Sequence, residues 1–253
     1  VKIDRDQNHL VLLAKNLTGY KNLLKLVTSS HLEGFYYKPR MDFELLEKYN
    51  EGLIALSGCL KGEIPELILE NQLAQAEKVA KKYSEIFADN FYLEIQRHPK
   101  SDELKKVNEQ LIRLSRKLGM PVVATNDNHY LNPEDAYAQE VLLCIQTQRT
   151  IHEKDRPLSM LDEPDFYFKS PAEMKGQFLD LPEAIDNTLK IAEECDLQLE
   201  YGKFILPAFK TPENESPDEY LKELVNKRIG RVSSFDQNEV RTRLDYELSV
   251  ITK

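Results

Sequence analysis

Two side chains that can bind a metal ion or move a proton follow a short apolar stretch near the middle of the chain. The stretch is residues 121–125 (PVVAT), and Asp127 and His129 come just after it. A β-branched apolar run behind Gly-Met-Pro predicts a buried strand, and alternate residues leaving a strand point to the same side. The two side chains can therefore converge as metal ligands or as an acid–base pair, or form an ordinary hydrogen-bonded pair. Ligands in α/β folds gather at carboxyl ends of strands, which favours a functional site.

Two further residues of ligating type adjoin predicted strands. His9 stands at the start of residues 9–14 (HLVLLA), and Cys59 follows residues 53–57 (LIALS) and Gly58. Imidazole and thiolate groups are common zinc ligands. A histidine at a strand end and a small buried cysteine are equally ordinary packing residues. Each residue alone therefore leaves both interpretations open.

A loop at residues 31–42 (HLEGFYYKPRMD) mixes aromatic and basic side chains. Tyr36 and Tyr37 stand beside Lys38 and Arg40, and such a mixture suits base stacking and phosphate contact. The alternative is a solvated rim around a packed ring. Lys38 and Arg40 are the candidate substrate-binding residues.

The elements that must position these residues alternate between strands and amphipathic helices. Apolar residues recur at helical spacing in residues 73–87 and 104–118, and residues 91–96 (FYLEIQ) alternate as a strand does. This order predicts an α/β fold with mainly parallel strands joined by right-handed crossovers. Beyond His129, the sequence predicts helices that begin near residues 133, 171 and 182, with a strand at residues 165–169 (DFYFK) between the first two.

The composition changes at Tyr201. Residues 203–217 contain three prolines and little periodicity, which predicts an extended linker or a wrapping arm. Ser216 and Glu219 form a capping box, and amphipathic helices follow, the last still running at Lys253. We therefore expect one domain over residues 1–200, and a linker with helices over residues 201–253.

The composition excludes several classes of protein. A hydrophobic fraction of 41% and a charged fraction of 30% are typical of a soluble globular protein, and no apolar run reaches transmembrane length. Cys59, Cys144 and Cys195 are too few and too scattered for a disulfide framework, which favours the cytoplasm. The net charge of −9 disfavours non-specific binding of duplex DNA by the whole segment. Since no initiator Met is present, we expect a piece of a longer protein.

In combination, these motifs resemble the PHP (polymerase and histidinol phosphatase) domain of bacterial C-family replicative DNA polymerase α subunits. In family order they are NHLVLLAKN, HLEGFYYKPRMD, LIALSGCLKGEIP, FYLEIQ, PVVATNDNHY, VLLCIQTQRTI, DFYFKSPAEM, ILPAFKTP and RLDYELSVITK. The resemblance covers nearly the whole chain. It implies a distorted seven-stranded β/α (TIM-like) barrel with a metal cluster at the carboxyl ends of its strands, then a helical connector that leads into the polymerase palm.

The resemblance also implies which residues bind metal. They are His9, Cys59, Asp127 and His129, and it gives no such role to His31, His98 or His152. The family's earlier ligands should precede His9 and the palm carboxylates should follow Lys253, so we expect a barrel that is incomplete at its N-terminal side. The donor set suits zinc, with manganese or iron as alternatives. Magnesium would serve the palm, outside this chain.

The implied function is that of a DNA-directed DNA polymerase, a nucleotidyltransferase. Its PHP domain would remove misincorporated nucleotides as a metal-dependent 3′–5′ exonuclease, or would brace the polymerase core. The isolated segment is expected to be inactive. DNA is the expected partner of the full-length protein, and the sliding clamp and other replisome subunits would bind through regions outside this chain, with no membrane involved. Two alternatives remain: a free-standing PHP-family phosphoesterase such as a histidinol phosphatase, and a catalytically inert structural module.

Overall fold

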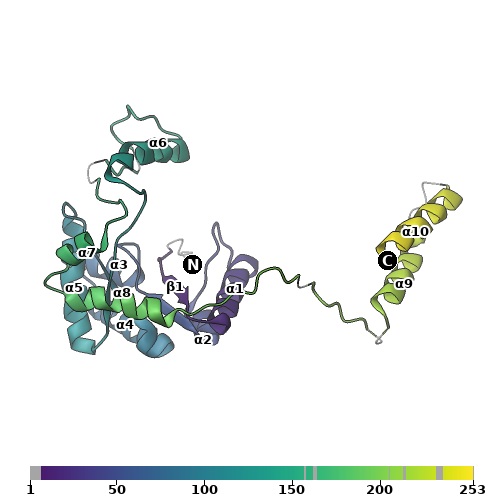
Figure 1. Ribbon diagram of the computed structural model, residues 1–253, viewed down its shortest axis with the longest axis horizontal. Coiled ribbons are helices and arrows are strands. Elements are labelled where there is room, and N and C mark those ends of the chain that lie inside the picture. The colour runs from purple at the N-terminus through teal and green to yellow at the C-terminus, as the bar shows by residue number, and fades with distance from the viewer. Residues whose placement is uncertain are drawn as a thin grey trace. The chain divides into compact units, whose positions relative to one another are not determined.

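The computed structural model describes residues 7–156, 158–161, 164–204, 206–212, 215–231 and 236–252. The chain divides into two compact units, Val1–Leu199 and Glu200–Lys253. The first unit is a mixed α/β unit and the second is built from helices, as Figure 1 shows. The polar residues at the start of the sequence, Ile205 of the ILPAFKTP motif and Lys253 lie outside the described residues.

A four-stranded sheet lies at the centre of the first unit, within the described residues. Its order is β1 (Val11–Ala14), β2 (Leu53–Leu56), β3 (Phe91–Gln96) and β4 (Val122–Thr125). The strands β2, β3 and β4 run parallel to one another, as predicted, whereas β1 runs antiparallel to β2. The reason is that two helices, α1 (Leu17–Leu32) and α2 (Phe43–Tyr49), bring the chain back to where β1 ended, so Ala14 pairs with Leu53. A closed seven-stranded barrel stays a prediction.

The two faces of the sheet are covered differently, because successive strand residues point to opposite sides. One face, with Leu53, Leu93 and Ile95, packs against the buried sides of α3 (Glu63–Leu69), α4 (Leu73–Phe87) and α5 (Asp102–Leu118). Each fully buried aliphatic side chain stabilises the fold by about 1.5–3 kcal/mol. On the other face, Tyr92 belongs to a smaller cluster with Ile191 of α8 (Pro182–Glu194). The helix and strand positions predicted for residues 73–118 are thereby confirmed.

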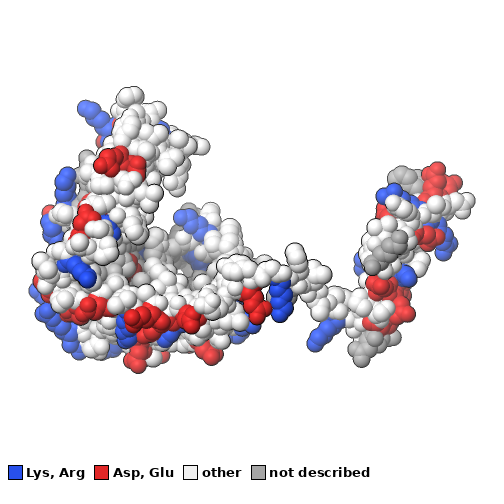
Figure 2. All heavy atoms as spheres, in the orientation of Figure 1, with Lys and Arg blue, Asp and Glu red and all other residues white. Residues whose placement is uncertain are grey.

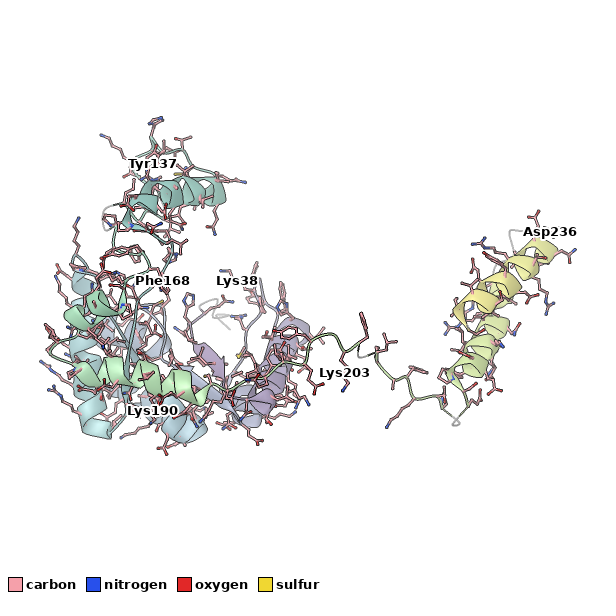
Figure 3. The ribbon with its side chains drawn as sticks, viewed as in Figure 1. Lys38, Tyr137, Phe168, Lys190, Lys203 and Asp236 are labelled. Carbon is pink, nitrogen blue, oxygen red and sulfur yellow. The ribbon has the colours of Figure 1, made fainter. Side chains whose placement is uncertain are left out.

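The chain between β4 and α8 departs from the predicted pattern in one place. A 3₁₀ turn, η2 (Pro133–Asp135), leads into α6 (Ala136–Thr147), and α7 (Pro171–Gln177) begins at the predicted capping box of Ser170 and Glu173. The strand predicted at residues 165–169 is wrong. Its backbone makes only a single bridge, between Tyr130 and Tyr167, because the chain turns at Ser170 to cap α7. Figure 3 labels Phe168 in this segment.

α6 extends away from the sheet, as Figure 1 shows. A buried ion pair links α6 to the segment that follows it. The carboxylate of Glu140 is fully buried and accepts hydrogen bonds from the Arg156 guanidinium and from the backbone N–H of Met160. Cys144 of the same helix is buried, as expected for a core residue.

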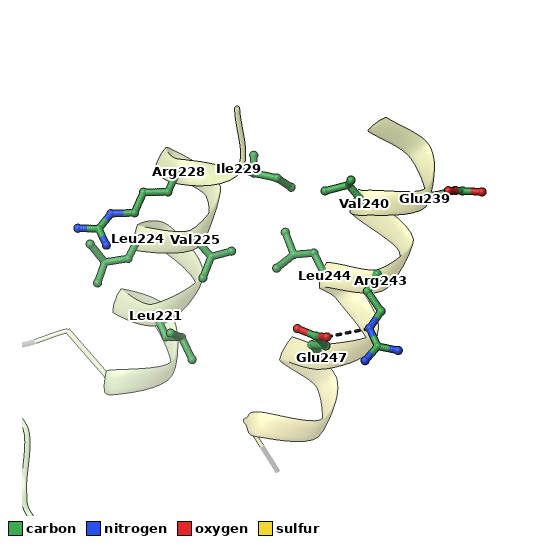
Figure 4. A pocket seen from close by; sticks show the side chains of 10 residues that line it. All are labelled: Leu221, Leu224, Val225, Arg228, Ile229, Glu239, Val240, Arg243, Leu244 and Glu247. Atoms are coloured by element: carbon green, nitrogen blue, oxygen red, sulfur yellow. Dashed lines mark hydrogen bonds and ion pairs between the residues drawn. The ribbon is translucent and has the colours of Figure 1, made fainter. Parts of the chain in front are cut away.

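The second unit is a helical hairpin preceded by an extended segment. It contains α9 (Pro217–Arg228), the short turn η3 (Ile229–Arg231) and α10 (Gln237–Ile251). The capping box of Ser216 and Glu219 is confirmed. Leu221, Leu224 and Leu244 line a hollow of 610 Å³ between the two long helices, shown in Figure 4. α10 ends at Ile251, with Thr252 as its cap.

Two surface properties bear on the expected partners. On the face of the first unit that Figure 2 displays, Lys and Arg side chains are interspersed with Asp and Glu. None of the helices in the described ranges is both long and apolar enough to cross a lipid bilayer.

Candidate metal centre

The strand ends that precede or follow the candidate ligands gather at one edge of the sheet. The carboxyl ends of β2, β3 and β4 lie together because these strands are parallel. β1 runs the other way, so its amino end, which follows His9, lies at the same edge and pairs Val11 with Leu56. The sheet therefore brings an amino end and three carboxyl ends to one side of the unit.

His9 and Cys59 meet at this edge. The Nδ1 of His9 lies 3.6 Å from the Sγ of Cys59, and the backbone N–H of His9 donates to the carbonyl of Lys61 over 2.8 Å. Gly58 makes the approach possible. Its φ is +81°, and a Cβ at this position would lie 2.6 Å from the carbonyl oxygen of His9, so only glycine fits without a shift of backbone.

Asp127 and His129 form a second pair. The Oδ1 of Asp127 lies 3.4 Å from the Nε2 of His129. The backbone N–H of His129 donates to the carbonyl of Phe166, and the His129 ring stands edge-on to the Phe166 ring at 5.7 Å. Asn126 fixes the start of this turn, because its Nδ2 donates to the carbonyl of Tyr167 over 2.7 Å. Phe166 and Tyr167, which belong to the segment predicted as a strand, thus support the pair of Asp127 and His129.

The charge of Asp127 in the second pair affects the pKa of Cys59 in the first pair. Burial raises the pKa of the Cys59 thiol, and the negative charges of Asp127 and Glu94 raise it further, while a backbone hydrogen bond from Lys61 opposes them. Among the residues that the structure describes, however, no three His, Cys, Asp or Glu side chains form a group able to hold one metal ion. A single centre built from all four residues stays a prediction.

The donor types fit a metal site nonetheless. Each pair combines an imidazole with a thiol or a carboxyl, and these are the groups that zinc takes as ligands. His9, Cys59, Asp127 and His129 could hold a divalent ion between them if the pairs closed on it.

Glu94 of β3 is a site residue that sequence reasoning missed. Its side chain is buried, with a relative exposure of 6%. Burial raises the pKa of its carboxyl, as does the charge of Asp127, although hydrogen bonds from Thr125, Gln96 and the Gly58 N–H lower it. The signal was present in the strand FYLEIQ, because an acidic residue within a buried strand requires polar partners.

One face of β3 and its exit is polar although it is buried. Tyr92, Glu94, Gln96 and His98 alternate along this face, and all four are buried. In the described part of the chain, three buried side-chain polar atoms lack a hydrogen-bond partner, and all three belong to this row: Tyr92 Oη, Glu94 Oε2 and His98 Nε2. Buried polar atoms without partners are rare in folded proteins and mark positions with a role beyond packing.

The candidate substrate-binding residues lie in the loop before α2. The Arg40 guanidinium lies over the Tyr36 ring at 4.8 Å from its centre, and Tyr36 and Tyr37 meet edge to face at 4.7 Å. Arg40 lines a hollow of 580 Å³ together with His9. Lys38, labelled in Figure 3, is exposed. The loop thus places Arg40 near the first ligand pair, while contact with a substrate stays a prediction.

Comparison with known proteins identifies the class first. Residues 1–98 match the model of the PHP domain family, and this part of the chain belongs to it. Nearly the whole chain is similar to DNA polymerase III subunit alpha. The identity is 45% over 96% of the chain for the protein of Borreliella burgdorferi and 42% over 99% for that of Treponema pallidum, each time across 21% of the relative. For Thermus aquaticus it is 46% over 88% of the chain and 18% of the relative. The chain thus spans about a fifth of the length of these relatives.

Proposed function

We propose that this chain is a segment of a bacterial replicative DNA polymerase alpha subunit, a DNA-directed DNA polymerase. The observation that carries the proposal is 45% identity over 96% of the chain to DNA polymerase III subunit alpha. Residues 1–200 would be the downstream part of the PHP domain, and residues 201–253 a connector toward the palm. Strands from outside this chain would complete a seven-stranded barrel beside β1, which is an outer strand of the present sheet.

We assign the metal site to His9, Cys59, Asp127 and His129. Zinc suits this donor set best, with manganese or iron as alternatives. A divalent ion held there would supply an activated water and charge stabilisation for phosphodiester hydrolysis. The chain's own residues hold the ligands in place: Gly58 lets His9 approach Cys59, and Phe166 fixes the backbone and ring of His129.

The substrate of this reaction would be the 3′ end of a DNA strand. Lys38 and Arg40 would contact its phosphates, since cations beside aromatic rings suit single-stranded nucleic acid. Polymerisation itself would take place in a magnesium-dependent palm outside this chain, in the cytoplasm. The sliding clamp and other replisome subunits would bind through further regions of the full-length protein.

A second candidate role is structural support of the polymerase core without hydrolysis. It is favoured by the two separate ligand pairs, because the described residues form no group of three metal-ligating side chains. A barrel edge tied together by hydrogen bonds could brace a neighbouring domain without any metal.

The test uses the full-length protein as wild type and as Asp127→Asn. We would measure bound metal by elemental analysis, excision of a mismatched 3′ nucleotide and extension of a matched primer. We expect wild type to contain metal and to do both reactions, and Asp127→Asn to lose metal and excision but to keep extension. Asp102→Asn is the matched control, because the Asp102 side chain is 94% exposed at the start of α5.

Each outcome separates the candidates. Wild type that extends primers without metal or excision would favour the structural role. Metal and excision that persist in Asp127→Asn would contradict the assigned site. A full-length protein without primer extension would overturn the polymerase assignment.

A further inference from the structure

Glu94 lies between the two strands that lead to the candidate ligands. It belongs to β3, which pairs with β2 on one side and with β4 on the other. β2 leads to Cys59 and β4 leads to Asp127 and His129. The side chain of Glu94 is buried on the face of β3 that also carries Tyr92 and Gln96.

The carboxyl of Glu94 forms a hydrogen bond with the last residue of β4. The Thr125 hydroxyl donates to the Oε1 of Glu94 over 2.5 Å. The Nε2 of Gln96 donates to the same oxygen over 3.1 Å and to the Thr125 Oγ1 over 3.2 Å. Thr125 is the last residue of β4, and Asp127 follows two positions later. These three side chains close a ring of hydrogen bonds immediately before the second ligand pair.

The backbone of Glu94 forms a hydrogen bond with the residue that follows β2. The backbone N–H of Glu94 donates to the Ser57 hydroxyl over 2.9 Å, and the Gly58 N–H lowers the pKa of the Glu94 carboxyl. The N–H of Ser57 in turn donates to the carbonyl of Tyr92 over 3.0 Å. Gly58 is the residue before Cys59 and the residue against which His9 packs. Glu94 therefore binds the side chain two residues before Cys59 through its backbone N–H, and the side chain two residues before Asp127 through its carboxyl.

We propose that Glu94 is a positioning residue for the metal centre: its backbone N–H binds Ser57 at the end of β2, its carboxyl binds Thr125 at the end of β4, and the two contacts together set the separation between Cys59 and the pair of Asp127 and His129. This inference rests on the proposed function. A buried carboxyl is costly, and apolar residues that replace it together with its hydrogen-bond partners are often neutral or stabilising in such a place. The site geometry, rather than the stability of the sheet, explains why an acid stands here.

The experiment uses the full-length protein with cobalt(II) as the probe, because cobalt replaces zinc in such sites and a thiolate–cobalt absorption band reports on Cys59. We would measure cobalt affinity, the absorption spectrum and the melting temperature for Glu94→Leu, Glu94→Gln and Glu94→Asp. We expect Glu94→Leu to weaken cobalt binding about 10- to 100-fold, as changes around metal ligands do, with an altered band and a lower melting temperature, because Thr125 and Gln96 lose their buried acceptor.

The other variants separate geometry from charge. Glu94→Gln keeps a hydrogen-bond acceptor at the same distance from the backbone, so we expect it to retain the wild-type affinity and band. Glu94→Asp keeps the charge but is one methylene shorter, so it should behave as Glu94→Leu does. Glu140→Leu is the matched control. It removes another fully buried carboxyl, in α6, and should lower the melting temperature without changing the cobalt spectrum.

Failure of the inference differs from failure of the proposed function. If wild type binds no cobalt through Cys59, the proposed metal site fails and the role of Glu94 with it. If wild type shows the band and Glu94→Leu has the same affinity and spectrum, only the positioning role is overturned. A melting temperature that falls in parallel with cobalt affinity in all three Glu94 variants would also overturn it, because that pattern indicates a purely structural residue.

Discussion

The Nδ1 of His9 lies 3.6 Å from the Sγ of Cys59, although 50 positions separate the two residues in the sequence. The contact exists because β1 is antiparallel to β2, which places the residue before β1 beside the residues after β2. In an all-parallel sheet, the start of β1 would lie at the opposite edge. The direction of one outer strand therefore decides whether His9 can take part in the site.

Gly58 should be the most sensitive glycine at this edge. Its φ of +81° costs an L-residue about 1–2 kcal/mol, and a Cβ would also meet the carbonyl oxygen of His9 at 2.6 Å. We expect Gly58→Ala to lower the free energy of unfolding by more than the conformational cost alone, and to separate His9 from Cys59. Denaturant unfolding and the NMR signals of the His9 ring would report the two effects.

Gly119 provides the control for Gly58. Its φ of +69° carries the same kind of conformational cost, but a Cβ there would meet nothing within 4 Å. Gly119→Ala should therefore lose only the conformational part and leave the His9 signals unchanged. Equal losses of stability in the two variants would show that the contact with His9 does not contribute to the free energy of unfolding.

Glu173 should titrate far below an ordinary glutamate. Hydrogen bonds from the Ser170 hydroxyl, the Tyr167 hydroxyl and the Ser170 N–H lower its pKa from 4.5 to about 2. Because the folded-state pKa is depressed, its contribution to stability is complete above pH 4.5 and is lost as the pH falls through about 2. NMR titration of the Glu173 carboxyl should show this value, and Ser170→Ala and Tyr167→Phe should each raise it. A normal pKa in the unmodified protein would contradict the capping geometry.

Arg156 should be essential for the stability of the α6 segment. Its guanidinium lies 2.6 Å from the fully buried carboxylate of Glu140. We expect Arg156→Ala to destabilise by about 3–5 kcal/mol, because it leaves a buried charge without its partner. Arg149→Ala, which removes an exposed ion pair with Glu153, should cost less than about 1 kcal/mol. Hydrogen exchange of the α6 amides would measure both, and similar exchange rates in the two variants would argue against the buried pair.

Lys38 and Arg40 should contribute to binding of single-stranded DNA by the full-length protein. If each contacts one phosphate, the double variant Lys38→Ala/Arg40→Ala should weaken binding and reduce the slope of log affinity against log salt by about 1–2. Lys105→Ala/Lys117→Ala is the matched control, since it removes the same charge from exposed positions on α5. The phosphate contacts would be refuted by a salt slope that changes equally in both double variants.

The sequence determined those features that depend on neighbours along the chain. The apolar spacing of residues 73–87 and the alternation of FYLEIQ predicted α4 and β3 at their observed bounds. The capping boxes at Ser170 and Ser216 predicted the starts of α7 and α9. Propensity, periodicity and capping act within a few residues, so a single sequence is sufficient to read them. The motifs that resemble the PHP domain likewise needed only the residues, and the family match over residues 1–98 confirms that resemblance.

The tertiary structure alone decided how these elements meet. The reversed direction of β1 follows from the lengths and packing of α1 and α2, which no local pattern encodes. DFYFK has the composition of a strand, yet its backbone makes only one bridge because it braces the turn that carries His129 and because the chain turns at Ser170 to cap α7. Glu94 became visible as a site residue only when its partners were seen to be Ser57, just after β2, and Thr125, at the end of β4. Contacts between residues far apart in sequence depend on the whole packing of the chain, and that is why they had to be seen in three dimensions.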